Sequence, residues 1–481
     1  MSGFVTVPGV GSSKVHIALN SADTLALAKT IATQMWPLYG FDELQVDTVP
    51  GTVTAPNGEL LLVNTVPTSV NLTGKGYNFV SDQNGGNTIT IGPSVSVIAG
   101  GTAGDTIFGA GGDTIAAGGG AGGSSITVVD NTPDSLKYNI VGGIGSDTIN
   151  ATGGGTIVGG AGANLISSAN LFGEASYVLS NGADSVYATG GGNEVVSASG
   201  ANAMVWVAQD SGGNATVSAS GSADTVVASG AGSSSITASG SDDMIAVNQP
   251  SGGATSVNVT GSNIVVMGGG DGTLAVTVSG SNDTVAAGTT GATTVDASSS
   301  AVIFGGPGAL TFIGEATGTP TIVGYAGANT DLTIGDQGAV FADNGPTANV
   351  TVGAGQATIF GGSGGEVNVF GSQSGALYVA GAGNETVDAA QSTISGPTGN
   401  LFWGSSAAGS NDLMIAGAGT DTLAAGAGHD TLTGGPGSDA FVFFQSNTAG
   451  TNVTTINDLP VAIASSFSIT ARPRIRFLAL Q

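Results

Sequence analysis

Short apolar segments separated by glycine-rich turns follow one another from about Gly86 to Val442. In DTIN (147–150) and NLIS (164–167), an isoleucine lies two residues after the polar turn residue, which is the start of a short strand with an inward-facing apolar side chain. One turn and one strand together take about nine residues, so two such units make a coil of about 18. The pattern therefore predicts an all-β fold, a parallel β-roll or β-helix solenoid of roughly twenty coils.

The first 85 residues have a different pattern. Ser21 to Tyr39 has apolar residues at helical spacing behind a Ser or Asp N-cap, and residues 41–80 resemble short strands separated by proline and glycine turns. We expect residues 1–85 to form a small α+β module that caps or attaches the solenoid, because an open terminal coil exposes strand edges. The expected remainder is a degenerate β-solenoid over 86–406, a regular repeat block over 407–442, and a strand and tail over 443–481.

Four nine-residue units follow end to end in the regular block, at 407–415, 416–424, 425–433 and 434–442. Each unit has an aspartate at its sixth position and an apolar residue at its eighth. Glycines before the aspartate let the backbone turn with φ > 0, so that carbonyl groups point at an ion, and the carboxylate supplies an anionic oxygen. The expected ligands of Ca²⁺ are Asp412, Asp421, Asp430 and Asp439, with the turn glycines Gly417, Gly419, Gly426, Gly428, Gly435 and Gly437.

The geometry of such a solenoid predicts how these aspartates pair. Consecutive half-coils lie on opposite edges, so the turn that shares an ion with a given turn is two units along the chain. This pairs Asp412 with Asp430 on one edge and Asp421 with Asp439 on the other.

The unit GGPGSDAFV (434–442) and the segment GGIGSD (142–147) fit G-G-x-G-x-D-x-U-x. These units resemble the repeats of RTX (repeats-in-toxin), or haemolysin-type, calcium-binding proteins. The resemblance implies a calcium-bound parallel β-roll. It also implies type I secretion from a Gram-negative bacterium, directed by an uncleaved C-terminal signal.

Elsewhere the repeat is degenerate. Asn164 falls one coil after Asp147, so we expect a weaker calcium site there. Asp224, Asp243 and Asp283 are each followed by a strand but have serine where the repeat has glycine. In two further units, a glutamate occupies the aspartate position: Glu194 in GGGNEVV and Glu385 in GAGNETV.

Composition narrows the classes of function. The chain of 481 residues has 85 glycines, and its 33 acidic and 7 basic residues give a net charge of −26. Such a charge disfavours nucleic acid and anionic membrane surfaces as partners and favours cations. With no cysteine there is no disulfide or thiolate site. We expect no membrane span, and no cleavable secretory signal at the N-terminus.

Several functions remain open for the rod outside the cell. We expect a secreted or surface-located structural or matrix protein that folds on binding extracellular calcium, with cell-surface polysaccharide or self-association as further partners. An adhesin and an ice-binding solenoid are alternatives, the latter because threonine follows the acid in many units. A polysaccharide lyase or epimerase is disfavoured, because His16 and His429 are the only histidines and the expected solenoid contains one lysine, Lys137, although catalysis by carboxylate pairs stays open.

Two further expectations concern particular side chains. Five phenylalanines (Phe304, Phe312, Phe341, Phe360 and Phe370) are expected to stack in the core of the solenoid. All three arginines (Arg472, Arg474 and Arg476) lie in the last ten residues, which departs from the acidic or neutral tails of the family. This tail is either an unusual secretion signal, a basic docking segment or the result of a reading-frame change.

Overall fold

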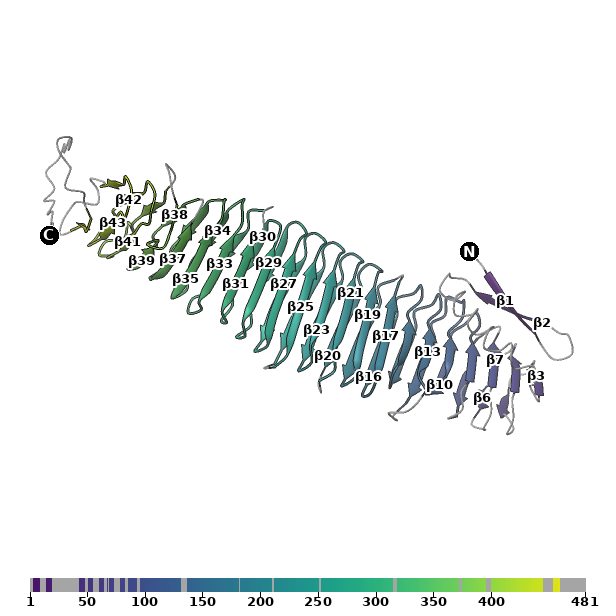
Figure 1. Cartoon of the computed structure of the whole chain (residues 1–481). Coiled ribbons are helices and arrows are strands. Elements are labelled where there is room, and N and C mark those ends of the chain that lie inside the picture. The colour runs from purple at the N-terminus through teal and green to yellow at the C-terminus, as the bar shows by residue number, and fades with distance from the viewer. Residues whose placement is uncertain are drawn as a thin grey trace. The chain divides into compact units, whose positions relative to one another are not determined.

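A computed structural model describes most of the chain (Figure 1). The described residues are 3–8, 14–19, 43–47, 51–54, 60–64, 67, 69–72, 78–82, 85–92, 96–130, 136–180, 182–209, 212–250, 252–314, 318–371, 374–394, 399–443 and 453–458. They fall into two compact units, Met1–Thr255 and Ser256–Gln481. Within the described residues every regular element is a strand, and no helix long and apolar enough to cross a membrane is found.

The first unit contains an antiparallel pair, β1 (Gly3–Pro8) with β2 (Lys14–Leu19), and two parallel sheets. Odd-numbered strands pair with odd-numbered strands (the odd sheet), and even-numbered with even-numbered (the even sheet). The odd strands are β3 (Glu43–Asp47), β5 (Leu60–Asn64), β7 (Asn78–Asp82), β9 (Ser96–Ala99), β11 (Thr114–Ala116), β13 (Tyr138–Val141), β15 (Gly155–Val158), β17 (Glu174–Leu179), β19 (Asn193–Ala198), β21 (Ala215–Ala219) and β23 (Ser234–Ala238). The even strands are β4 (Thr52–Thr54), β6 (Ser69–Leu72), β8 (Thr88–Ile91), β10 (Thr106–Ala110), β12 (Ser125–Val129), β14 (Thr148–Thr152), β16 (Leu165–Asn170), β18 (Ser185–Gly190), β20 (Met204–Gln209), β22 (Thr225–Gly230) and β24 (Met244–Gln249).

The second unit has the same two kinds of parallel sheet, and β25 (Ala254–Val259) contains the boundary between the units. Its odd strands are β27 (Thr273–Val278), β29 (Thr293–Ala297), β31 (Leu310–Gly314), β33 (Thr330–Ile334), β35 (Thr347–Val352), β37 (Gly365–Gly371), β39 (Glu385–Asp388), β41 (Leu413–Ile415), β43 (Thr431–Thr433) and β45 (Thr455–Ile456). Its even strands are β26 (Val265–Gly270), β28 (Asp283–Ala286), β30 (Ala301–Phe304), β32 (Thr321–Val323), β34 (Ala339–Ala342), β36 (Ala357–Phe360), β38 (Ala376–Val379), β40 (Leu401–Trp403), β42 (Thr422–Ala424) and β44 (Ala440–Val442).

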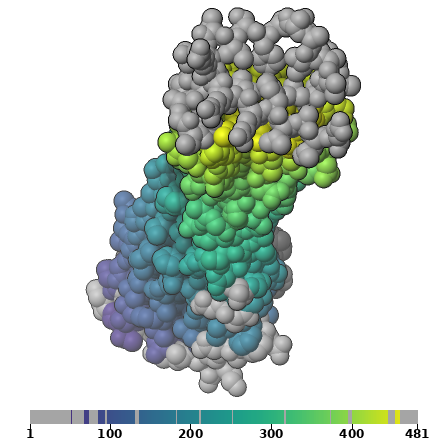
Figure 2. Space-filling view, turned by 90° about the vertical axis from the view of Figure 1, so that its left-hand side faces the viewer, coloured from purple at the N-terminus to yellow at the C-terminus, as the bar shows by residue number. Residues whose placement is uncertain are grey.

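The chain alternates between the two sheets, so each coil contributes one strand to each. In Figure 2 the colours advance in chain order within each unit. The two units together amount to about 18 turns, close to the roughly twenty expected. Coil length varies around the expected 18 residues. Asp147 and Asn164, which align between neighbouring coils, are 17 residues apart, whereas the aligned residues Ala376 and Asn400 are 24 apart.

The core consists of inward rows of mostly aliphatic side chains from both sheets. In the even sheet of the first unit, successive coils align the same residue type and leave each side chain fully buried: Ile89, Ile107, Ile126, Ile149 and Ile166. Stacking identical β-branched residues at strand spacing fills a narrow interior without voids. A core built this way needs few large side chains, which explains how a chain with 5% aromatic residues folds.

A second internal row has a period of two coils. Where the even strands of the first unit end, buried amides alternate with glycines in the aligned order Asn170, Gly190, Gln209 and Gly230. A Cβ at Gly190 would lie 2.1 Å from the Asn170 carbonyl oxygen, and one at Gly230 would lie 2.4 Å from that of Gln209. The glycines are required because neighbouring turns approach this closely.

The predicted parallel β-solenoid is confirmed. The expected helix at Ser21–Tyr39 lies outside the described residues, so the α+β character of the N-terminal module stays a prediction. Parallel pairing begins upstream of residue 86, because Glu43 of β3 aligns with Leu60 of β5, which aligns with Asn78 of β7.

The expected phenylalanine core is only partly right. Phe312 and Phe341 are fully buried, whereas Phe304 and Phe360 are 44% and 45% exposed on the outer face of the even sheet and Phe370 is half-buried. Residues at alternate strand positions face opposite sides. Phe304 and Phe360 are the last residues of strands whose inward residues are Ile303 and Ile359.

The alternation within one strand predicts a large difference between two adjacent substitutions. Ile149→Ala should lower the free energy of unfolding by about 2–5 kcal/mol, because it leaves a cavity in a stacked row. Asn150→Ala, at the exposed outward position beside it, should change it by less than about 0.5 kcal/mol. Urea unfolding of both variants followed by circular dichroism measures the difference, and equal effects would contradict the inward and outward assignment.

Candidate calcium-binding turns

The four nonapeptides form the strands β41 to β44, each of three residues. In the first three, the apolar residue at the eighth position faces inward and is fully buried: Met414, Leu423 and Leu432. The aspartate lies two residues earlier, where the turn meets the strand. Its carboxylate therefore lies beside the turn of the neighbouring coil in the same sheet.

The structure brings Asp412 and Asp430 together on the odd sheet. The backbone N–H of Asp412 donates to Oδ1 of Asp430 at 3.1 Å, and the N–H of Gly426 donates to its Oδ2 at 2.8 Å. Asp412 is held in the same way, by the N–H groups of Glu385 at 3.2 Å and Ser405 at 2.7 Å. All four carboxylate oxygens of this pair thus accept a backbone hydrogen bond.

Asp421 and Asp439 are neighbours on the even sheet, and their environment differs. The N–H of Asp421 donates to Oδ1 of Asp439 at 3.0 Å, and the N–H of Asn400 donates to Oδ1 of Asp421 at 2.5 Å. Oδ2 of Asp421 is buried and has no hydrogen-bond partner among the described residues. A buried anionic oxygen without a donor is costly unless a proton or a cation accompanies it.

The same bond recurs through the degenerate coils. We call the residue directly before each even strand the turn position. In the first unit the N–H of Ser124 donates to Asp147 at 2.6 Å, that of Asp147 to Asn164 at 2.8 Å, and that of Asn164 to Asp184 at 2.8 Å. Asp224 continues the series by donating to Asp243 at 2.9 Å. The nonapeptide aspartates of the even sheet therefore occupy a structural position that Asn and Ser also fill.

At the predicted weaker site, Asn164 acts as a donor as well as an acceptor. Its amide Nδ2 donates to the carbonyl oxygens of Gly159 at 2.8 Å and Gly162 at 3.0 Å and to Oδ1 of Asp184 at 2.8 Å. Those carbonyls are the kind of oxygen that a calcium ion would use. The amide of Asn164 thus binds carbonyl oxygens that an ion in this turn would otherwise use.

The predicted turn glycines lie where adjacent coils are closest. A Cβ at Gly437 would lie 1.7 Å from the carbonyl oxygen of Gly419, and one at Gly435 would lie 2.5 Å from that of Gly417. On the other sheet, a Cβ at Gly426 would lie 2.1 Å from the Ser405 carbonyl oxygen, and Gly428 has φ of +116°. These glycines are needed for stacking, whatever else their carbonyls bind.

The sequence did not single out Asn400 or Asp458 as members of these turns, and it placed Glu385 at an aspartate position. Asn400 precedes Asp421 by one coil, and the carboxylate of Asp458 accepts the N–H groups of Gly434 at 2.9 Å and Gly435 at 2.6 Å. Glu385 aligns with Asp412, and its buried Oε2 accepts from the Tyr378 hydroxyl and the N–H of Gly381. The signal was a polar residue directly before an apolar strand, as in GNLFW (399–403) and NETV (384–387).

Burial raises the pKa of these carboxyl groups. The pKa of Asp421 rises to about 6, mainly through burial, with the charge of Asp439 adding to the effect and the Asn400 N–H opposing it. The pKa of Asp430 also rises to about 6, because burial and the charge of Asp412 outweigh its backbone hydrogen bonds. Burial also raises the pKa of Asp412 and Asp439.

These features fit a calcium ion better on one edge than on the other. In the described residues no three acidic or histidine side chains converge on one point, so an ion would take several oxygens from backbone carbonyls, as Ca²⁺ commonly does. The unpartnered oxygen of Asp421 and the adjacent carboxylate of Asp439 fit such an ion. Asp412 and Asp430 are already satisfied by N–H groups, so an ion there would have to compete with those bonds.

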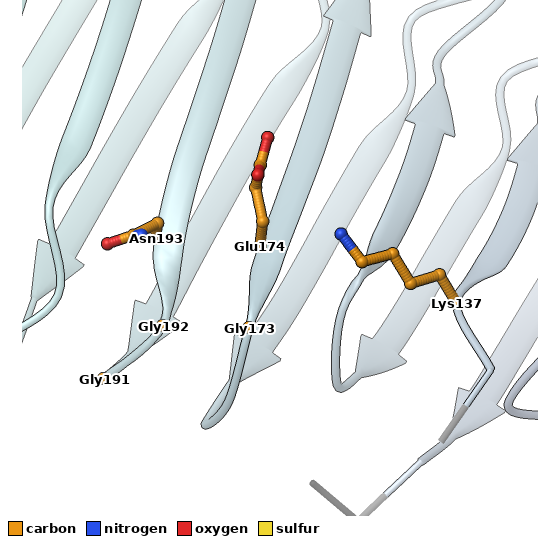
Figure 3. A pocket seen from close by; sticks show the side chains of 6 residues that line it. All are labelled: Lys137, Gly173, Glu174, Gly191, Gly192 and Asn193. Atoms are coloured by element: carbon orange, nitrogen blue, oxygen red, sulfur yellow. The ribbon is translucent and has the colours of Figure 1, made fainter. Parts of the chain in front are cut away.

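The first unit has an open pocket of about 470 Å³, lined by Lys137, Gly173, Glu174, Gly191, Gly192 and Asn193 (Figure 3). Its polar side chains are one amine, one carboxylate and one amide. The nonapeptide turns bring pairs of buried carboxylates together, so they are a stronger candidate for a functional site than this pocket.

Comparison with known families identifies the block. Residues 406–441 match the RTX calcium-binding nonapeptide repeat in four copies, which confirms the resemblance inferred from the sequence. Such repeats bind calcium, so Ca²⁺ is the expected cofactor of this block. Comparison with curated proteins and comparison with solved structures both gave no match.

The raised pKa values predict how acid affects the calcium-free chain. The folded pKa of Asp421 and Asp430 (about 6) exceeds the ordinary value of about 3.9, so the folded state binds more protons between these values. Stability should therefore fall as pH rises from about 4 to about 6 and stay low above that. We expect the thermal midpoint in chelator to be higher at pH 5 than at pH 7.5, measured by circular dichroism. The opposite order would contradict the assignment.

Asp421→Asn should imitate the protonated carboxyl. It keeps the oxygen that accepts the Asn400 N–H and removes the buried charge, so the calcium-free thermal midpoint at pH 7.5 should rise by about 2–4 °C, the effect of ~1 kcal/mol in a unit of this size. The matched control is Asp336→Asn, which removes an exposed carboxylate and should leave the midpoint unchanged. A fall in the midpoint of Asp421→Asn would contradict the prediction.

Proposed function

We propose that this protein is a secreted, calcium-dependent structural solenoid whose nonapeptide block completes its fold when it binds extracellular calcium. The single observation that supports this most strongly is the pair Asp421 and Asp439, with a buried carboxylate oxygen that lacks a donor. The bound ion would be held by these two carboxylates and the carbonyl groups of Gly417, Gly419, Gly435 and Gly437. The second site, at Asp412 and Asp430 with Gly426 and Gly428, would be the weaker one, and Asp147 with Asn164 weaker still.

The chain's own residues account for the calcium requirement. At neutral pH the adjacent carboxylates of Asp421 and Asp439 repel each other in a partly buried turn, which disfavours closure of the last coils. Calcium bound to the folded turn but not to the unfolded chain stabilises the fold by mass action. Extracellular millimolar calcium would saturate sites with Kd of about 10⁻⁴–10⁻³ M, whereas the much lower calcium of a cytosol would not.

We also propose that the protein is exported from the cell before its repeats close. RTX repeats are typical of secreted bacterial proteins. A chain that cannot close its repeats before it meets calcium remains suited to passage through a type I channel, and the block would nucleate coil stacking afterwards. The arginine-containing tail would carry the signal, and it lies outside the described residues.

Calcium titration of the purified chain tests the proposal. In chelator, added calcium should increase the β-sheet circular dichroism signal and the thermal midpoint, with half-saturation between about 10⁻⁴ and 10⁻³ M. Asp421→Asn combined with Asp439→Asn should weaken this response by at least ~10-fold, because it removes both anionic ligands.

The control variant also loses two negative charges, at exposed positions elsewhere in the second unit. Asp331→Asn combined with Asp336→Asn changes two exposed carboxylates and should respond to calcium like the wild type. A wild-type chain whose signal and midpoint do not change with calcium would overturn the proposed function.

A further inference from the structure

The outer face of the even sheet in the second unit is apolar. Two outward rows, one from each of two positions on strands β26 to β38, form what we call the apolar face. The first row is Val265, Thr284, Val302, Thr321, Val340, Thr358 and Leu377, and the second is Met267, Ala286, Phe304, Val323, Ala342, Phe360 and Val379. Beyond this face the rows continue on β40 with Leu401 and Trp403. No side chain in these two described rows is charged.

The opposite side of the same unit has the usual surface chemistry. One aligned outward row of the odd sheet is Thr294, Thr311, Asp331, Asn349, Asn368 and Asp388, and the other is Asp296, Ile313, Thr333, Thr351 and Phe370. The amides of the former row bond along it, from Asn349 to Asp331 at 2.7 Å and from Asn368 to Asn349 at 3.1 Å. The second unit therefore has one largely apolar face and one more polar face. This difference requires a reason, because large side chains such as Phe304 and Phe360 are 44% and 45% exposed.

The size of the apolar face suits a weak dimer. Seven strands at about 4.8 Å spacing, with about four residues each at about 3.3 Å, give roughly 450 Å² of flat area. Two such faces bury about 900 Å², which lies at the low end of specific interfaces and corresponds to a reversible contact.

Charge limits where two copies of this chain could meet. The chain has 33 acidic and 7 basic residues, so two copies repel each other over most of their surfaces. The apolar face is where that repulsion is smallest and where burial of apolar area favours contact. A sugar chain would instead need hydrogen-bonding groups beside the aromatic rings, and in these rows the polar groups are threonine hydroxyls.

The order of large and small residues is self-complementary. A two-fold axis parallel to the strands and passing through β32 sets Phe304 of one copy opposite Ala342 of the other, and Phe360 opposite Ala286. Val323 then meets its own counterpart. The first row is symmetric about the same strand, because Val302 faces Val340 and Thr284 faces Thr358.

We propose that the second unit forms a two-fold dimer through the apolar face, with Val323 and Thr321 on the axis. The two even sheets pack face to face at about 10 Å, as in β-sandwiches, and each phenylalanine fills the space above an alanine. An isologous contact of this kind closes after two copies. The acidic odd sheet of each copy then faces solvent.

Charge exchange at the axis tests this directly. Sedimentation velocity of the full chain at up to about 200 µM, in about 5 mM calcium, should show a wild-type monomer–dimer equilibrium. Val323→Glu and Val323→Lys each place like charges opposite each other, and each should raise the dimer Kd at least ~10-fold. Mixing these two variants should restore dimers, because Glu then faces Lys. Thr333→Glu, an exposed outward change on the odd sheet, should dimerise like the wild type.

A second pair of variants tests the packing without charge. Ala342→Phe should oppose dimer formation by clashing with Phe304 of the second copy. Adding Phe304→Ala should restore the dimer, because the double variant exchanges the large and the small residue of this pair. Circular dichroism confirms that each variant is folded. A wild type that stays monomeric throughout overturns the proposal, even if it binds phosphatidylcholine vesicles, which would assign the face to lipid. Equal loss of dimer in Thr333→Glu overturns it too.

Discussion

The hydrogen bond from a backbone N–H at one turn to a side-chain oxygen at the aligned turn of the next coil is the interaction on which this structure depends. Strand pairing fixes neighbouring coils at about 4.8 Å, and some turn N–H groups bond to carbonyl groups of the neighbouring coil, as that of Ala161 does to Gly143 at 2.9 Å. Where the turn meets the even strand, a side-chain oxygen satisfies the N–H instead. Asp147, Asn164 and Asp184 each accept such an N–H and are all buried. This bond stacks the turns as regularly as the strands.

The same bond relates the nonapeptide turns to the turns of the other coils. Aspartate accepts the N–H as well as asparagine does, but it leaves a negative charge in a buried turn, which raises its pKa. Where two aspartates follow each other, as at Asp421 and Asp439, the charge needs a cation or protons. Where asparagine follows, as at Asn164, its amide donates to the turn carbonyls instead. The repeat thus meets one constraint with paired aspartates in some turns and with an asparagine amide in others.

The sequence was sufficient for the period, the parallel stacking and the pairing of the nonapeptide aspartates, because all three follow from local spacing. It was not sufficient for the role of Asn400 or Asp458, because coil length varies and only the register of the strands shows which turns meet. Nor did it separate Phe304 from Phe312. Both residues lie in short apolar strands. A shift of one residue in register relative to the turn decides whether the side chain faces the core or solvent. The calcium ligands themselves remain predictions from the repeat and the turn geometry.

We infer that the turn at Asp421 and Asp439 needs a cation to complete it. A crystal structure in millimolar calcium, with the ions located by anomalous scattering, tests this most directly. We expect a calcium ion within about 2.3–2.6 Å of carboxylate oxygens of Asp421 and Asp439 and of turn carbonyls. Anomalous signal absent from this turn, with the coils folded as described and Oδ2 of Asp421 bonded only to water, would contradict it.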